Sequence, residues 1–218
     1  MATDALIHVV DDDDDMRDSL VWLIESAGYP ALGYDSAEVF LQAFRDDRPS
    51  CLVLDVRMPG MSGLELYERL RAHAPRTPAI FVTAHADVPT ALRAFRSGAF
   101  EFLEKPFERQ QLIERVARAV ETDARRRQHE EQWAAIQSKI AQLSVKEREV
   151  LSLLMRGASN KVIAMELDIT ERAVEMRRAS LMKKLQMASL AEVVQLATRF
   201  EMGRELRQSI SAESAAID

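Results

Sequence analysis

The sequence predicts an α/β domain built on a doubly wound parallel sheet, followed by a smaller all-α domain. In the first part of the 218-residue chain, short apolar runs alternate with helical patterns, whereas every signal after residue 143 is helical. The charge changes as well: residues 1–124 hold 13 Lys and Arg against 22 Asp and Glu, and residues 125–218 hold 16 against 13. An acidic part joined to a mildly basic part suggests a different partner for each.

Five strand-sized apolar runs and five helical patterns make up the first part. The strands are expected at residues 6–10, 30–34, 51–54, 79–82 and 100–103, and the helices at 16–27, 37–44, 63–73, 88–97 and 108–120. Strand–helix units of this length imply a parallel sheet with helices on both faces. We place this domain at residues 1–122.

Residues 123–142 are charged and contain no Gly or Pro, so they are predicted to be a helical connector that continues the preceding helix. Trp133, Ile136 and Ile140 recur in it at helical spacing, and Leu143, just after it, continues the pattern. This stripe indicates packing, either within the chain or against a second subunit.

Residues 143–204 read as a four-helix domain. Ser144-Val-Lys-Glu147 is a capping box, and Ser159 and Thr170 are N-cap candidates for helices at Asn160–Glu166 and Glu171–Leu185. A last helix is expected at Leu190–Phe200. The polar tail, residues 205–218, is predicted to fray.

Composition excludes several classes of protein. The chain is 47% hydrophobic and 29% charged, which is ordinary for a globular protein and not for a disordered one. One cysteine, Cys51, excludes an internal disulfide framework and suits a reducing cytosol. No apolar run reaches the roughly 18 residues of a membrane span, and five aspartates follow the first one, unlike a signal peptide. We therefore expect a cytoplasmic protein with no membrane partner.

Acidic residues gather where predicted strands end. Asp11 and Asp12 follow the first strand, Asp55 ends the third, Thr83 ends the fourth, and Lys105 follows the fifth. Ligands of a doubly wound sheet bind beyond the carboxyl ends of its strands. Three carboxylates at one edge repel one another and need a cation, and oxygen ligands without His or Cys favour Mg²⁺.

These pieces resemble the receiver domain of response regulators. Four of them carry the resemblance over residues 5–122: Val-Val-Asp11-Asp12, Leu-Asp55-Val-Arg-Met-Pro-Gly-Met-Ser-Gly63, Val-Thr83-Ala and Lys105-Pro106-Phe. The resemblance implies a flavodoxin-like (βα)5 fold. It also implies that Asp55 is the phosphoacceptor and that Asp11, Asp12, Asp55 and the backbone carbonyl of Arg57 hold Mg²⁺.

The same resemblance assigns phosphoryl contacts to the Thr83 hydroxyl and the Lys105 ammonium. Phosphoryl transfer needs charge neutralisation, which Mg²⁺ and a lysine supply. A phosphoryl group on Asp55 would draw Thr83 inward and let Phe102 rotate toward the core, although Phe102 can also be plain core. His85 is expected to shape water access to the site.

The second domain resembles the LuxR-type helix-turn-helix over residues 139–201. The resemblance rests on Leu143–Leu151, Gly157–Ala164, Leu167–Thr170 and Val174–Leu185, and with the receiver it points to the FixJ/NarL-type regulators. The helix at Glu171–Leu185 suits a major groove, and its basic residues can neutralise phosphates. We expect DNA contacts from Lys161, Thr170, Arg172, Val174, Glu175, Met176, Arg177, Arg178, Lys183 and Lys184.

Ala173 and Arg177 depart from the Thr and His common at their positions in that family, so the target sequence cannot be transferred from relatives. The implied partners are a sensor histidine kinase, promoter DNA, RNA polymerase and a second copy of the chain. The implied function is a phosphorylation-switched transcriptional regulator and not an enzyme. Phosphorylation would act by dimerisation or by relief of inhibition.

Two alternatives belong to other classes. The helical domain could bind protein in place of DNA, in which case its affinity would lack the steep salt dependence of phosphate contacts. Haloacid-dehalogenase-type phosphatases share the order acid, Asp, Thr and Lys. However, the first-strand acids here lead into Met16-Arg-Asp-Ser19 without the nucleophile motif of those enzymes.

Overall fold

A computed structural model describes residues 4–74, 77–84, 87–189, 191–198 and 200 of the chain. The chain divides into two compact units, residues 1–128 and 129–218, which are described separately below. His85 and the expected polar tail, residues 205–218, lie outside the described residues.

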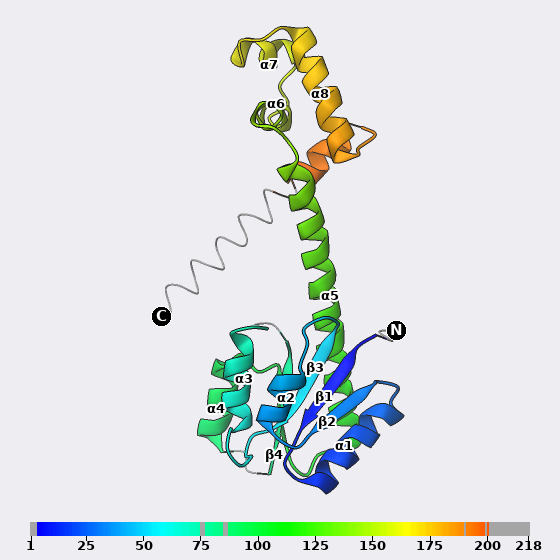
Figure 1. Cartoon of the computed structure of the whole chain (residues 1–218), viewed down its shortest axis with the longest axis vertical. Coiled ribbons are helices and arrows are strands. Elements are labelled where there is room, and N and C mark those ends of the chain that lie inside the picture. Colours follow the sequence, from blue (N-terminus) through cyan, green and yellow to red (C-terminus); the bar gives the residue numbers. More distant parts are fainter. Residues whose placement is uncertain (1–3, 75–76, 85–86, 190, 199, 201–218) are drawn as a thin grey trace. The chain divides into compact units, whose positions relative to one another are not determined.

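The first unit is a five-stranded parallel sheet in the order β2-β1-β3-β4-β5, which confirms the predicted fold class (Figure 1). Its third strand is buried along its whole length, as expected for a strand covered on both faces. The register places Ile7 beside Cys51 and Asp55 beside Val82. The strands are β1 (Leu6–Val10), β2 (Ala31–Tyr34), β3 (Ser50–Asp55), β4 (Ala79–Thr83) and β5 (Glu101–Glu104).

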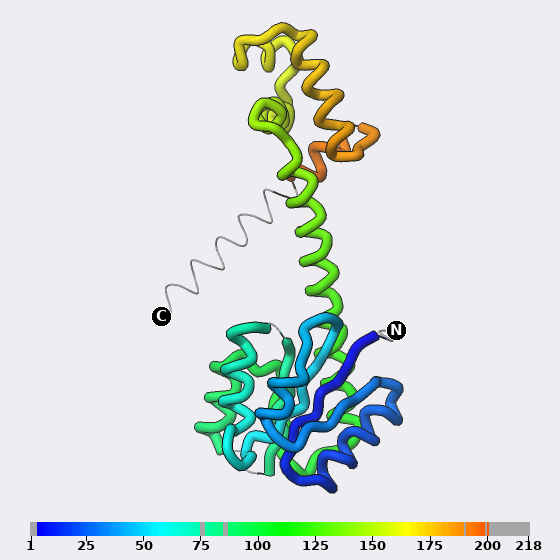
Figure 2. The backbone as a smooth tube through the Cα atoms, viewed as in Figure 1, coloured from blue at the N-terminus to red at the C-terminus, as the bar shows by residue number. Residues whose placement is uncertain are grey.

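Helices cover both faces of this sheet, and Figure 2 follows the chain from strand to strand. The helices are α1 (Asp14–Ser26), α2 (Ala37–Ala43), α3 (Gly63–Arg71), α4 (Val88–Arg96) and α5 (Arg109–Ala141). Side chains of α1 and α5 pack in one apolar cluster, and those of α2, α3 and α4 pack in the other. Helix α1 begins before the predicted Met16, because Asp13 caps it by accepting a hydrogen bond from the Met16 amide.

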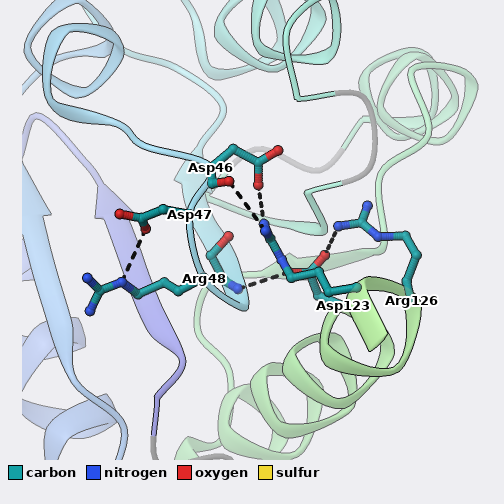
Figure 3. Close-up of polar contacts among 7 residues, drawn as sticks. Asp46, Asp47, Arg48, Asp123 and Arg126 are labelled. Atoms are coloured by element: carbon teal, nitrogen blue, oxygen red, sulfur yellow. Dashed lines mark hydrogen bonds and ion pairs between the residues drawn. The ribbon is translucent and has the colours of Figure 1, made fainter. Parts of the chain in front are cut away.

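The predicted last helix of the first domain and the predicted connector form one helix, α5, of 33 residues. Asp123, buried on this helix, accepts hydrogen bonds from the Ser50 amide (3.0 Å) and the Arg127 Nε (2.8 Å), and it pairs with Arg126 (Figure 3). Arg127 also pairs with Asp46. We call this network the Asp123 anchor. It explains why the first unit extends past residue 122, to Gln128.

The second unit holds α6 (Val145–Met155), α7 (Asn160–Glu166), α8 (Glu171–Leu185) and helical residues at 191–198 and 200. Ile140 and Leu143 are buried in one of its clusters, and the Trp133 ring stacks on Phe200 at 5.3 Å. The apolar stripe of the connector therefore packs within this unit. No helix among the described residues is long and apolar enough to span a bilayer.

Candidate functional site

Three of the predicted site residues meet at the carboxyl edge of the sheet. The Lys105 Nζ donates to the Asp11 Oδ2 (2.9 Å) and to the Asp55 Oδ1 (3.0 Å). Both aspartates are buried, with 2% and 9% of their surfaces exposed. Two carboxylates that would otherwise repel each other thus converge on one ammonium group. Asp11 and Lys105 are 94 positions apart in the sequence, and the parallel sheet brings the ends of their strands to the same edge.

Burial and pairing oppose each other in this cluster. Burial raises the pKa of Asp55, with a further contribution from the charge of Asp11, against hydrogen bonds from Lys105 and the Arg57 amide. Burial acts to lower the pKa of Lys105, but its bonds to Asp11 and Asp55 outweigh this and raise it. Lys105 is therefore a cation at neutral pH, which is what an anionic phosphoryl group needs beside it.

The loop after β3 holds the carboxylate of Asp55 through backbone contacts. The Arg57 amide donates to the Asp55 Oδ2 at 2.6 Å. Gly63 then begins α3 directly against this loop: a Cβ on Gly63 would lie 2.0 Å from the carbonyl oxygen of Asp55. Sequence reasoning placed Gly63 in a motif but gave it no role. The structure shows that only glycine fits there without a backbone shift.

Thr83 and Phe102 lie on the two neighbouring strands. Thr83, 1% exposed, ends β4, and its carbonyl accepts the Lys105 amide at 2.8 Å. Phe102 is half-buried and packs against the cluster of α2, α3 and α4. The Lys105–Pro106 peptide bond is cis. Thr83 therefore stands at the same edge as Asp55, while the switch role of Phe102 stays a prediction.

The predicted metal ligands are only partly brought together. Asp11 and Asp55 converge on one cation, and their oxygens are donors that suit Mg²⁺. Asp12 is exposed, and the part of the chain that the structure describes contains no group of three or more acidic, His or Cys residues placed to hold a metal. Magnesium binding at Asp11, Asp12, Asp55 and Arg57 stays a prediction.

The second predicted site is the surface of α8. Arg172, Glu175, Met176 and Lys183 are exposed on this helix, and Lys161 is exposed on α7. Thr170 is the N-cap of α8, and its Oγ1 accepts the Ala173 amide at 3.2 Å. Arg177 is half-buried. Arg172, Met176 and Lys183 recur at helical spacing, so they share one exposed side of α8.

The expectation that Val174 contacts DNA was wrong. Val174 has no exposed surface, and it packs with Val150 and Ile163 in the core of the unit. It belongs to the stripe Val174, Leu181 and Leu185, whose spacing keeps all three on the buried side of α8.

Two basic residues of α8 have partners inside the unit. The Lys184 Nζ lies 2.7 Å from the Glu147 Oε2, and Arg178 donates to the Asn160 side chain. The sequence predicted Glu147 as part of a capping box, and its pairing with Lys184 was not predicted. A basic residue on an amphipathic helix carries no local signal of which acid it meets.

A buried aspartate facing a lysine at the edge of a parallel five-stranded sheet, followed by a separate helical unit with an exposed basic helix, defines a receiver joined to a helix-turn-helix. The response regulator receiver domain family matches residues 7–117, and the luxR family of bacterial regulatory proteins matches residues 141–197. The chain belongs to the response regulators that carry a luxR-type DNA-binding domain.

Similar proteins agree along almost the whole chain. The transcriptional regulatory protein FixJ of Bradyrhizobium diazoefficiens is 43% identical, covering 93% of this chain and 98% of FixJ. The response regulator TodT of Pseudomonas putida is 33% identical over 90% of this chain and 87% of TodT. The solved structure of the response regulator StyR, 42% identical, has a TM-score of 0.84 and covers 90% of this chain and 99% of that one.

Proposed function

We propose that phosphorylation of Asp55 by a partner histidine kinase switches DNA binding by α8, so that the chain regulates transcription. The observation that carries this proposal is the Lys105 ammonium held between the buried carboxylates of Asp11 and Asp55. A buried acid with a cation already in place is suited to receive an anionic group.

The transfer step joins a carboxylate of this edge to the phosphoryl group of the donor. A carboxylate oxygen of Asp55 attacks the phosphorus of a phosphohistidine, and the P–N bond breaks as the O–P bond forms, so that the imidazole leaves. The Lys105 ammonium can then turn from the Asp55 oxygen to an oxygen of the phosphoryl group. The Thr83 hydroxyl donates a second hydrogen bond.

Magnesium fits the donor chemistry of the same edge. Asp11, Asp12, Asp55 and the backbone carbonyl of Arg57 would hold the ion. Bound there, Mg²⁺ would neutralise charge on the phosphoryl oxygens. Lys105 supplies the remaining positive charge, and its pairing with Asp11 keeps it within reach of Asp55.

A groove beside the site supports the kinase partner. It has a volume of about 760 Å³, reaches Lys105 and runs along α1. Trp22 on its rim is 62% exposed, which is unusual for so large an apolar side chain. A groove of mixed apolar and polar lining suits a helix of a protein that delivers the phosphoryl group.

An exposed apolar face on α4 supports assembly of two copies. Val88, Leu92 and Phe95 recur there at helical spacing and are 71%, 50% and 54% exposed. We propose that phosphorylation, acting through Thr83 and Phe102, adjusts this face and favours a homodimer. Two linked helix-turn-helix units would then bind a DNA site made of two half-sites. RNA polymerase would be a further partner of the DNA-bound protein.

The proposal is tested by phosphorylation from acetyl phosphate with Mg²⁺, followed by intact-mass measurement. The wild-type protein and an Asp47→Asn control, altered at an exposed aspartate, should gain one phosphoryl group. Asp55→Asn should gain none. Labelling of Asp55→Asn at another residue would remove Asp55 as the acceptor.

The DNA arm is tested by mapping the genomic fragments retained by the protein with and without beryllofluoride, which mimics the phosphoryl group. Enrichment of a defined set of sites that grows with beryllofluoride is expected. An affinity for duplex DNA that does not fall with added salt would favour a protein partner for the helical unit.

A further inference from the structure

One carboxylate links two helices of the second unit. Glu147, 5% exposed on α6, accepts a hydrogen bond from the Ser180 Oγ on its Oε1 and from the Lys184 Nζ on its Oε2, each at 2.7 Å. Ser180 and Lys184 lie one turn apart on α8, so they form one flank of that helix. The carboxylate therefore contacts α8 at two successive turns.

The Glu147 side chain also caps the N-terminus of its own helix, α6. Glu147 closes the capping box of α6, and its Oε2 accepts the Ser144 amide at 2.7 Å. Burial acts to raise the pKa of Glu147, but the bonds from Lys184, Ser180 and Ser144 outweigh it and lower the pKa to about 2. Glu147 is thus an anion whose hydrogen bonds come from inside the unit.

A contact to α7 holds α8 from another side. Arg178 donates to the side chain of Asn160, the first residue of α7. The buried stripe through Leu181 fixes the side of α8 that faces the core. With both flanks held, the side that points outward is set, and it carries Arg172, Met176, Ala179 and Lys183.

We propose that Glu147 and Lys184 are a positioning pair that fixes the rotation of α8 about its axis, and that Lys184, unlike its neighbour Lys183, makes no contact with DNA phosphates. This inference rests on the proposed DNA binding and refines which residues perform it. Lys183 is exposed, whereas Lys184 is half-buried and its ammonium pairs with the Glu147 carboxylate.

The reason lies in the unequal cost of the two arrangements. If Lys184 turned to a phosphate, a buried carboxylate would lose its main cation, which is strongly unfavourable. A contact between Lys184 and a phosphate in water would stabilise the complex by less than this loss, because both groups are well solvated before they meet. The lysine therefore stays with Glu147 when DNA binds.

The experiment measures how the affinity for DNA depends on salt. The probes are a duplex enriched by the wild-type protein from a random library and a scrambled duplex of equal composition. Each phosphate contact contributes about 0.9 to the slope of log affinity against log salt. Lys183→Gln should reduce this slope by about 0.9, and Lys184→Gln should leave it unchanged. Equal reductions in both variants would overturn the proposal.

Removing the charge of Glu147 tests the pair from the other side. Glu147→Gln should free Lys184 to contact a phosphate and so steepen the slope by about 0.9. Because α8 would no longer be held in one rotation about its axis, the ratio of the affinities for the enriched and the scrambled duplex should fall by about tenfold. Glu147→Gln combined with Lys184→Gln should return the slope to the wild-type value. An unchanged slope and ratio in Glu147→Gln would contradict the positioning role.

Circular dichroism at each salt concentration shows whether the variants are folded. If Glu147→Gln is unfolded, the comparison of Lys183→Gln with Lys184→Gln decides the proposal by itself. Wild-type protein that enriches no sequence and shows no salt-dependent affinity would overturn the proposed DNA binding. Wild-type binding with equal slopes for the two lysine variants overturns only the present inference.

Discussion

At the scale of single residues, the site depends on groups that other parts of the chain hold in place. Asp55 is fixed by the Arg57 amide and by Lys105, and the loop that supplies the amide is closed by Gly63. These contacts come from a backbone amide, from a lysine side chain that is 16% exposed and from a glycine, so all of them depend on the packing around Asp55. Small changes in the surroundings of Asp55 should therefore alter both stability and phosphorylation.

Gly63→Ala should destabilise the first unit by about 1–3 kcal/mol, because the added methyl would collide with the carbonyl of Asp55 and push the loop aside. It should also slow labelling by acetyl phosphate. Urea unfolding and the rate of mass gain measure the two effects. Gly33→Ala is the control, since the atoms nearest its methyl would belong to the side chains of Arg17 and Val21, and the long Arg17 side chain can move. Equal losses in both variants would contradict the prediction.

His8 should make the first unit sensitive to acid. Burial lowers the pKa of His8 to about 4; the charge of Asp47 acts to raise it by a smaller amount, and the charge of Arg48 acts to lower it further. The unfolded chain takes up a proton near pH 6.5 and the folded chain only near pH 4, so stability falls as pH drops through this window. The loss is about 3 kcal/mol for the full window.

Urea unfolding of residues 1–128 between pH 7 and pH 4 measures this effect. His8→Gln, which can still bond to the Tyr34 hydroxyl, should show a flatter dependence on pH. His73→Gln, altered at an exposed histidine, should behave as the wild type. The same dependence in His8→Gln would assign the acid sensitivity to other groups.

At the scale of elements, residues 123–127 in the middle of α5 are held to the rest of the first unit by charge. Amphipathic packing through Leu112, Val116 and Val120 accounts for the first turns. Beyond them, the Asp123 anchor ties the helix to the amide of Ser50, the first residue of β3, and to Asp46 in the preceding loop (Figure 3). The helix therefore stays part of the first unit for several residues after its apolar contacts end.

Asp123→Asn should destabilise the first unit by about 3–5 kcal/mol, because it leaves Arg126 and Arg127 without their buried partner. Hydrogen exchange should also speed up at the amides of residues 123–128. Glu121→Gln breaks an exposed pair with Arg125 on the same helix and should cost no more than about 0.5 kcal/mol. A similar small effect for Asp123→Asn would refute the anchor.

At the scale of the whole molecule, two units with separate apolar cores share one chain. The first unit has two clusters that sandwich the sheet, and the second has two that join α6, α7 and α8 with the end of α5. Each unit has the core that independent folding requires. In the proposed function, a signal from Asp55 would therefore pass between two units that each have their own apolar core.

A fragment of residues 1–128 should fold cooperatively and unfold at a higher urea concentration than a fragment of residues 1–122. The shorter fragment lacks Asp123 and Arg127, so it loses the anchor although it keeps every strand. Its m-value should stay close to that of the longer fragment, because little apolar surface is removed. Equal midpoints for the two fragments would show that the unit ends at residue 122.

The sequence by itself determined the alternation of strands and helices, the placing of Asp11, Asp55, Thr83 and Lys105 at strand ends, and the bounds of α7 and α8. It could do so because hydrophobic periodicity and capping residues act over a few neighbouring positions. The short acidic, Thr and Lys-Pro pieces each follow a predicted strand, and the parallel sheet brings such ends to one edge.

Only the tertiary structure decided which charges meet. Lys183 and Lys184 are adjacent and identical in type, yet one is exposed and the other pairs with Glu147, 37 residues away. Asp123 likewise lies in a charged stretch of the sequence, and the packing of α5 against the start of β3 buries it. The physical reason is that an ion pair or a buried contact depends on positions brought together by the packing of several elements, and no local pattern records that meeting.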